Sequence, residues 1–188
     1  MKRLQKQLLA VLTLIVICLS CAMPVGAAWQ QTNQKKWCYY HTDGSLAVGW
    51  EWIGGKWYHF DSNGIMQTGW IWDSNARVWY YCRSDGQMVY GWQKVDGKWY
   101  FLGAGGVMQT GWLWDQGKWY YLKPDGSMAT GWLEDQNGSR YYLKADGQMA
   151  IGQLKIDGIT YEFGTNGALI KDPGGTGLSW EERVLDLV

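Results

Sequence analysis

One segment of about 20 residues is repeated along most of the chain. The clearest copy, GWLWDQGKWYYLKPDGSMAT, begins at Gly111. GWEWIGGKWYHFDSNGIMQT begins at Gly49, and GWQKVDGKWYFLGAGGVMQT begins at Gly91. A fixed period of this length is typical of proteins in which small units stack and bury each other's surfaces. We therefore look for the function in one repeat and in the junction between two repeats.

The repeats divide the chain into four parts. We expect a signal peptide at 1–28, a polar lead-in at 29–36, a repeat domain at 37–171 and a tail at 172–188. Complete repeats begin at Gly49, Gly69, Gly91, Gly111 and Gly131, after an incomplete unit at 37–48 and before a degenerate one that begins at Gly152. Insertions near 73–76 and 136–138 both fall between Gly-Trp and Trp-Tyr-Tyr, which predicts a loop there.

The first 28 residues have the pattern of a secretory signal. Lys2, Arg3 and Lys6 precede an apolar run from Leu8 to about Leu19, and small residues follow it. This pattern predicts cleavage after Ala27 or Ala28 and a secreted protein. The run is short for a membrane span, so a retained anchor is the weaker alternative. We expect no membrane contact after cleavage.

Charge and cysteine content exclude several classes of function. Without the three basic residues of the signal, the chain has three more acidic than basic residues and no basic run. This argues against nucleic acid and anionic membrane surfaces as partners. Cys38 and Cys82 occupy different positions in repeats that are not neighbours, which favours free thiols. We expect no metal, no cofactor and no catalytic residues, and therefore no enzyme activity.

Each repeat is predicted to be a β-hairpin. Lys118–Leu122 is rich in aromatic residues and reads as a strand, Pro124-Asp125-Gly126 as a turn and 127–132 as the returning strand. The expected fold class is all-β, a solenoid of stacked hairpins. A capping box at Ser179 predicts a short helix from Trp180 to about Leu187. That helix would cover the last hairpin or form a homodimer contact, and a frayed tail is the alternative.

Aromatic residues recur at fixed places in the repeat. One Trp follows the opening Gly and a second opens the aromatic strand, as Trp112 and Trp119 do. Alternation along a strand puts Tyr121 on the face of Trp119 and Tyr120 on the opposite face. A groove lined by such rings attracts a quaternary ammonium through the ring quadrupoles, and it suits a sugar face nearly as well. The structural alternative is that these rings only hold the stack together.

The repeat resembles the cell-wall-binding repeats of choline-binding proteins from Gram-positive bacteria and their phages. The Gly-Trp, Trp-Tyr-Tyr and Asp-Gly-x-Met elements carry the resemblance, over residues 37–171. It implies a left-handed β-hairpin solenoid and choline sites between successive hairpins. Each site would use two Trp of one unit, a Tyr of the next and a nearby Met. The implied partner is choline on teichoic or lipoteichoic acid, and the implied location of the secreted protein is the cell surface or cell wall.

By position, the resemblance implies four choline cages with one methionine each. They are Trp50, Trp57 and Tyr81 with Met88; Trp70, Trp79 and Phe101 with Met108; Trp92, Trp99 and Tyr121 with Met128; and Trp112, Trp119 and Tyr142 with Met149. After Trp132, Arg140 replaces the second Trp and Glu162 the Tyr, so we expect no choline there. At the front, Trp29, Trp37 and His59 make an imperfect site.

The leading hypothesis is a non-catalytic module that binds choline on wall polymers. A glucan- or oligosaccharide-binding module is the second hypothesis, because glucan-binding and clostridial toxin repeats look similar. A structural or adhesin subunit is the third, with the array as a scaffold. Binding to choline, to a polysaccharide or to a protein partner would distinguish the three hypotheses.

Overall fold

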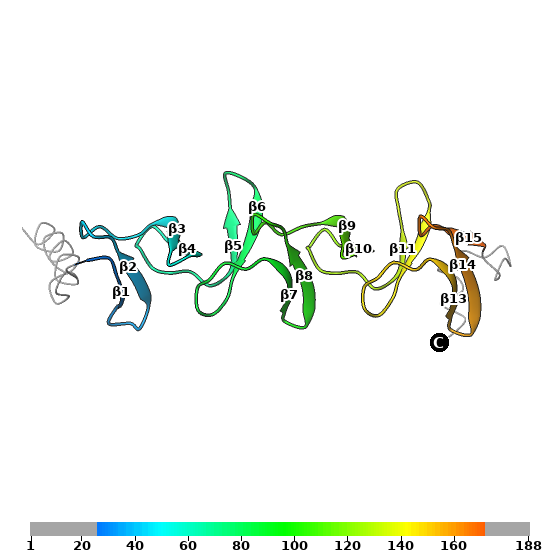
Figure 1. Ribbon diagram of the computed structural model, residues 1–188, viewed down its shortest axis with the longest axis horizontal. Helices are drawn as coiled ribbons and strands as arrows, with labels where there is room; N and C mark the ends of the chain where they lie inside the picture. Colours follow the sequence, from blue (N-terminus) through cyan, green and yellow to red (C-terminus); the bar gives the residue numbers. More distant parts are fainter. Residues whose placement is uncertain (1–25, 172–188) are drawn as a thin grey trace, which may run out of the picture. The chain divides into compact units, whose positions relative to one another are not determined.

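The computed structural model describes residues 26–171, and every regular element in that range is a β-strand. The strands are β1 (Ala28–Gln31), β2 (Trp37–Tyr40), β3 (Gly49–Ile53), β4 (Lys56–Phe60), β5 (Gly69–Asp73), β6 (Val78–Cys82), β7 (Gly91–Val95), β8 (Lys98–Leu102), β9 (Gly111–Asp115), β10 (Lys118–Leu122), β11 (Gly131–Glu134), β12 (Arg140–Leu143), β13 (Gly152–Ile156), β14 (Ile159–Phe163) and β15 (Leu169–Lys171) (Figure 1). The predicted all-β architecture of repeated hairpins is confirmed. The helix predicted from Trp180 lies outside the described residues.

The chain forms two compact units. One consists of the residues up to Ile71 together with Tyr81–Met88, and the other of Trp72–Tyr80 together with the residues from Val89 onward. The β5–β6 hairpin contributes its base to the first unit and its tip to the second. Each unit is built from the same hairpin and the same connecting turn.

The hairpin pairs different segments from those we predicted. The Gly-Trp strand β9 pairs with the aromatic strand β10 that follows it, with Gly111 opposite Leu122 and Trp112 opposite Tyr121. Gln116 and Gly117 link the two strands with φ values of 47° and 78°. Positive φ at both central residues defines a type I′ turn, whose twist matches that of paired strands. This turn, and not Pro124-Asp125-Gly126, closes the hairpin.

The Asp-Gly segment instead links one hairpin to the next. The Gly126 N–H donates to the Lys123 carbonyl at 2.8 Å, and the Ser127 N–H donates to Asp125 Oδ1 at 2.9 Å. Beyond this turn, Met128 forms a single antiparallel bridge with Leu122 instead of a second strand. The predicted turn is therefore present, but the predicted strand at 127–132 is replaced by a bridge and the start of β11.

Backbone hydrogen bonds join successive hairpins at the methionine. The Met128 N–H donates to the Trp99 carbonyl of the preceding hairpin at 2.7 Å. The same bond recurs throughout both units, from Met66 to Trp37, Met88 to Trp57, Met108 to Trp79 and Met149 to Trp119. Since each bond connects one hairpin with its neighbour, the stack is held by backbone as well as by side chains.

The first hairpin begins earlier than expected. Residues 28–31, which we assigned mainly to a polar lead-in, form β1 and pair with β2, with Trp29 opposite Tyr39. Ala28-Trp29 thus occupies the place that Gly-Trp has in later repeats. The insertions lie where predicted, at hairpin tips: Arg77 N–H bonds to the Asp73 carbonyl at 2.8 Å in one, and Gly138 N–H to the Asp135 carbonyl at 3.0 Å in the other.

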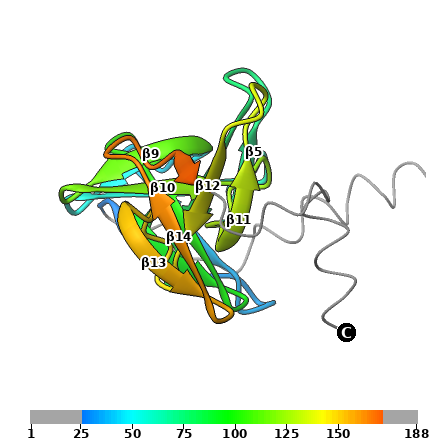
Figure 2. The same cartoon turned by 90° about the vertical axis from the view of Figure 1, so that its right-hand side faces the viewer.

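The buried core is thin and repeats with the hairpin. The last residue of an aromatic strand is fully buried at Leu102, Leu122 and Leu143. At the end of the described chain, β13, β14 and β15 form a three-stranded sheet (Figure 2), where Ala150, Ile156 and Phe163 make a larger cluster. Within 26–171, no helix is long and apolar enough to cross a membrane.

Candidate functional site: aromatic grooves between successive hairpins

Each hairpin carries different side chains on its two faces. Residues paired directly across the strands share a face. Trp112 pairs with Tyr121 and Trp114 with Trp119, which defines a Trp face, whereas Leu113 pairs with Tyr120 on the opposite, Tyr face. Because hairpins are stacked within each unit, the two faces of a hairpin meet different neighbours.

The Tyr face of one hairpin meets the Trp face of the hairpin before it. Ring centroids lie 4.9 Å apart for Trp92 and Tyr120 and 4.9 Å apart for Trp112 and Tyr141. In the first unit, Trp29 and Tyr58 are 4.8 Å apart. All three pairs meet edge to face at 62–66°. These pairs form one side of the groove between two hairpins.

The structure places the predicted tyrosines and Phe101 against the Trp of their own hairpins. Tyr121 and Tyr142 pack against the Trp of their own hairpins, Trp112 and Trp132, each at 5.2 Å. Tyr81 and Phe101 do the same, at 5.0 Å from Trp70 and 5.3 Å from Trp92 respectively. The ring that reaches the preceding hairpin is one residue earlier in the strand, because adjacent residues point to opposite faces. The alternation that we read from the sequence contained this signal.

The predicted Trp and Met residues are placed more nearly as expected. Trp112 and Trp119 lie 6.3 Å apart at 89° on the same hairpin. Each predicted Met is bonded through its backbone to the second Trp of its predicted cage, as Met128 is to Trp99. In the set that begins with Trp70, Trp70 belongs to the first compact unit, and the second contains Trp79, Phe101 and Met108.

A methionine also packs against the turn that follows. A Cβ added to Gly147 would lie 2.7 Å from Met128 Cε, and Gly126 stands in the same relation to Met108. Gly86 and Gly167 meet Met66 and Met149 in this way. Glycine is needed at these turns both for its φ near 80° and for the space occupied by the thioether. The methionine side chain therefore fills the space beside the next turn.

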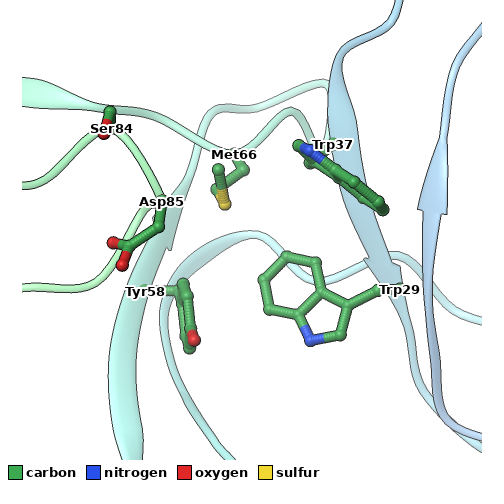
Figure 3. Close-up of a pocket in the computed structure, with 6 residues that line it drawn as sticks. All are labelled: Trp29, Trp37, Tyr58, Met66, Ser84 and Asp85. Atoms are coloured by element: carbon green, nitrogen blue, oxygen red, sulfur yellow. The ribbon is translucent and has the colours of Figure 1, made fainter.

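The first unit contains a defined cavity of about 400 Å³. Its lining residues are Trp29, Trp37, Tyr58, Met66, Ser84 and Asp85. Figure 3 shows the three aromatic rings and Met66 around one open space, with Asp85 beside Tyr58. The sequence suggested His59 for this junction, but His59 packs on Trp50 at 4.7 Å and its Nδ1 lies 2.6 Å from Gln67 Oε1.

Carboxylates lie close to the groove tyrosines. Burial raises the pKa of Tyr58, and the negative charge of Asp85 raises it further. Burial likewise raises the pKa of Tyr120, with Asp146 and Asp115 adding to the shift. The Trp92 indole N–H donates to Asp115 Oδ2 at 3.0 Å. Sequence reasoning missed these acids, which belong to neighbouring turns and hairpins; Asp85 lies on the turn two hairpins after Trp29.

The last described junction differs from the others. Arg140 stands where other hairpins have a Trp, and its Cζ lies 4.5 Å from the Trp132 ring centroid. Tyr161 packs on Trp132 at 4.9 Å, so the ring that closes the groove is present. Glu162, the residue expected at that position, pairs with Gln153 across the β13–β14 hairpin, and Tyr161 precedes it by one residue.

The two described cysteines offer no reactive group. Cys38 and Cys82 are free thiols, as predicted, and both are buried. Burial, followed by the charge of Asp85, raises the pKa of Cys82 to about 12. A thiol that stays protonated is a poor nucleophile. Among residues 26–171, no cluster of three His, Cys, Asp or Glu side chains could hold a metal ion.

A family model decides the identity of the repeats. The choline-binding repeat matches at residues 47–90, 89–131 and 109–153, which is more than half of the chain. The chain belongs to the choline-binding repeat family. A search of curated proteins found no match.

Solved structures of this family resemble the chain. Choline-binding protein F from Streptococcus pneumoniae, determined in the presence of a peptidoglycan analogue, is 34% identical over 79% of this chain and 54% of its own, with a TM-score of 0.71. The same protein in complex with ipratropium is 35% identical over 78% and 48%, with a TM-score of 0.67. This choline-binding-repeat chain therefore spans about half the length of these relatives.

A choline-binding domain alone is also similar. The domain of choline-binding protein L from Streptococcus pneumoniae is 36% identical over 77% of this chain and 76% of its own, with a TM-score of 0.59. The choline-binding repeat is thus the part of these proteins to which the chain is matched.

Proposed function

We propose that this chain is a non-catalytic, secreted cell-wall-binding module whose grooves bind choline groups of teichoic or lipoteichoic acid. The observation that carries the proposal is the cavity formed by Trp29, Trp37, Tyr58 and Met66. The related grooves are those of Trp92, Trp99, Tyr120 and Met128, and of Trp112, Trp119, Tyr141 and Met149. The Trp50–Trp57–Met88 set is proposed as a further site by its place in the repeat.

The chemistry of the cavity favours a cation over a neutral sugar. Ring faces attract a quaternary ammonium, which has no N–H group whose hydrogen bonds would have to be replaced in an aromatic site. The Asp85 carboxylate adds a negative charge at the wall of the cavity. A solved relative binds ipratropium, which is itself a quaternary ammonium compound. We place the choline trimethylammonium group between the rings, with Asp85 on its open side.

Repetition compensates for weak single sites. A few cation–π contacts of ~0.5–2 kcal/mol each, reduced by the cost of association, leave one groove with roughly millimolar affinity, or about −4 kcal/mol. Several grooves on a polymer that carries many cholines gain about 10²–10⁴ in avidity. Each contact can then exchange while the whole module stays attached to the wall.

Calorimetric titration with choline, beside a dextran control, tests the proposal. We expect saturable binding at several sites with roughly millimolar affinity, and elution of the protein from a tertiary-amine resin by free choline. Trp99→Ala should weaken retention on that resin. Tyr90→Ala serves as the matched control, because Tyr90 is 45% exposed and outside the groove residues named above. Full retention after replacement of every groove Trp would contradict the proposal.

Exposed tryptophan pairs support a second candidate function, oligosaccharide binding. Trp52 with Trp57 and Trp114 with Trp119 meet near hairpin tips at centroid distances of 5.4 and 5.2 Å, with the rings tilted by 60° and 55°. Trp52 and Trp114 are each 56% exposed. Flat indole surfaces of this kind pack well on the C–H faces of sugars. Heat on titration with dextran but none with choline would favour this candidate.

A further inference from the structure

The junction between the β11–β12 hairpin and the β13–β15 sheet contains a cation of its own. The Arg140 Cζ lies 4.5 Å from the centroid of Trp132, over the ring. In the preceding hairpin the corresponding residue is Trp119, which meets Trp112 at 6.3 Å and 89°. At this one described junction, a guanidinium therefore replaces an aromatic wall.

The rest of that groove is preserved. Tyr161 lies 4.9 Å from Trp132 at 74°, close to the 4.9 Å separations of the Trp92–Tyr120 and Trp112–Tyr141 pairs. Phe163 packs on Trp132 at 5.9 Å, and both belong to the cluster that buries Ala150 and Ile156. The groove has thus kept the ring faces that would attract a cation, although it has lost one wall.

The geometry points to Arg140 as an internal ligand that fills the last groove. Its guanidinium takes the place of a quaternary ammonium on Trp132, so the junction is stabilised without any ligand from outside. Arg140 and Trp132 are both half-buried, and cation–π attraction strengthens as the contact is shielded from water. The cation of this groove belongs to the chain itself, on the same Trp132 ring that packs against Tyr161 and Phe163 of β14.

A thermodynamic cycle on the purified protein tests the contact. We expect Arg140→Met to lower the Tm by about 2–4 °C in the absence of ligand. The same change should have no effect in a Trp132→Leu background, because the cation then has no ring to contact. Arg140→Lys keeps a cation and should lower the Tm by less than Arg140→Met does. Arg83→Met, at an exposed turn position, should leave the Tm unchanged. An equal loss from Arg140→Met in both backgrounds would overturn the inference.

If Arg140 occupies the last groove, its removal should free that groove for choline, and a count of choline sites tests this. This second experiment rests on the proposed function. Arg140→Trp restores the missing wall and should bind one more choline per chain than the unchanged protein in equilibrium dialysis. An unchanged number of sites, in a variant that folds, would overturn the assignment of Arg140 as the occupant. If neither protein binds choline, the proposed function fails, while the melting cycle still decides whether Arg140 and Trp132 are coupled. The melting cycle uses only Arg140→Met and Trp132→Leu, so it remains valid even if Arg140→Trp does not fold.

Discussion

The Tyr120 ring lies 4.9 Å from the Trp92 ring of the preceding hairpin, at an interplanar angle of 62°. Tyr121, the next residue, lies 5.2 Å from Trp112 of its own hairpin. Two neighbouring tyrosines thus belong to different grooves. One sequence repeat therefore does not correspond to one groove, because each groove is lined by side chains from two successive hairpins.

Replacement of Tyr120 and Tyr121 should have different consequences. Tyr120→Leu removes a ring from the Trp92 groove and is expected to weaken choline binding there by about 3–30-fold, the equivalent of a cation–π contact. Tyr121→Leu removes a ring that packs on Trp112 and should act on the following groove. Protein NMR with choline titration can assign the loss through the indole N–H signals of Trp92 and Trp112. Loss at Trp92 in the Tyr121 variant alone would contradict the assignment.

Two glycines with the same backbone strain separate the effect of φ from the effect of methionine packing. Gly147 has φ of 82° and Gly138 has φ of 75°. A Cβ at Gly147 would overlap Met128, whereas one at Gly138 meets nothing within 4 Å.

We expect Gly138→Ala to cost about 1 kcal/mol from strain alone. Gly147→Ala should cost a further ~1–3 kcal/mol because Met128 must move. Urea unfolding measures the free energy of unfolding of both variants. Equal losses in Gly138→Ala and Gly147→Ala would show that Met128 moves aside without cost.

The charge of Asp85 should contribute to cation binding in the first cavity. Asp85→Asn keeps the acceptor for the Gln87 N–H, which bonds to Asp85 Oδ1 at 3.0 Å, but removes the charge. We expect choline affinity at this cavity to fall by about 1.5–5-fold, as for an exposed charge pair, and its dependence on salt to weaken.

Asp43→Asn is the matched control for this charge. Asp43 makes the same kind of turn hydrogen bond, to the Ser45 N–H at 2.9 Å, but does not line the cavity. Choline titrations at low and high salt measure both variants. An equal loss of affinity in the two would mean that the effect of Asp85 is not local to the cavity.

Cys82 should make stability sensitive to alkaline pH. Its folded pKa is raised from the ordinary 9.0 to about 12, so the folded state favours the neutral thiol. The contribution of the buried Cys82 thiol to the free energy of unfolding is therefore complete below pH 9 and is lost as the pH rises towards 12. Urea midpoints of the protein and of Cys82→Ala should converge over this range, and a constant difference would argue against the shift. The native thiol should also be inert to a disulfide reagent at pH 8.

Much of the repeat could be predicted from residue order. The Gly-Trp and Trp-Tyr-Tyr elements recur at a fixed spacing and carry the aromatic residues, and the insertions near 73–76 and 136–138 indicated where length can vary. The position of the hairpin turn was predicted wrongly, because Asp125-Gly126 and Gln116-Gly117 are both turn sequences and the hairpin closes at the second. The residue pattern cannot rank them, since the decision depends on which turn allows two full strands to pair, as β9 and β10 do.

The sequence alone determined the all-β class, the period of the stack and the Trp and Met that recur within it. It also determined that Tyr120 and Tyr121 point to opposite faces, because alternation is a local property of an extended chain. Only the tertiary structure decided which neighbour each face meets, which placed Tyr120 on Trp92 and the Arg140 guanidinium on Trp132. Those contacts join residues of different hairpins, or of opposite strands, and arise from how the hairpins stack and not from their order in the chain.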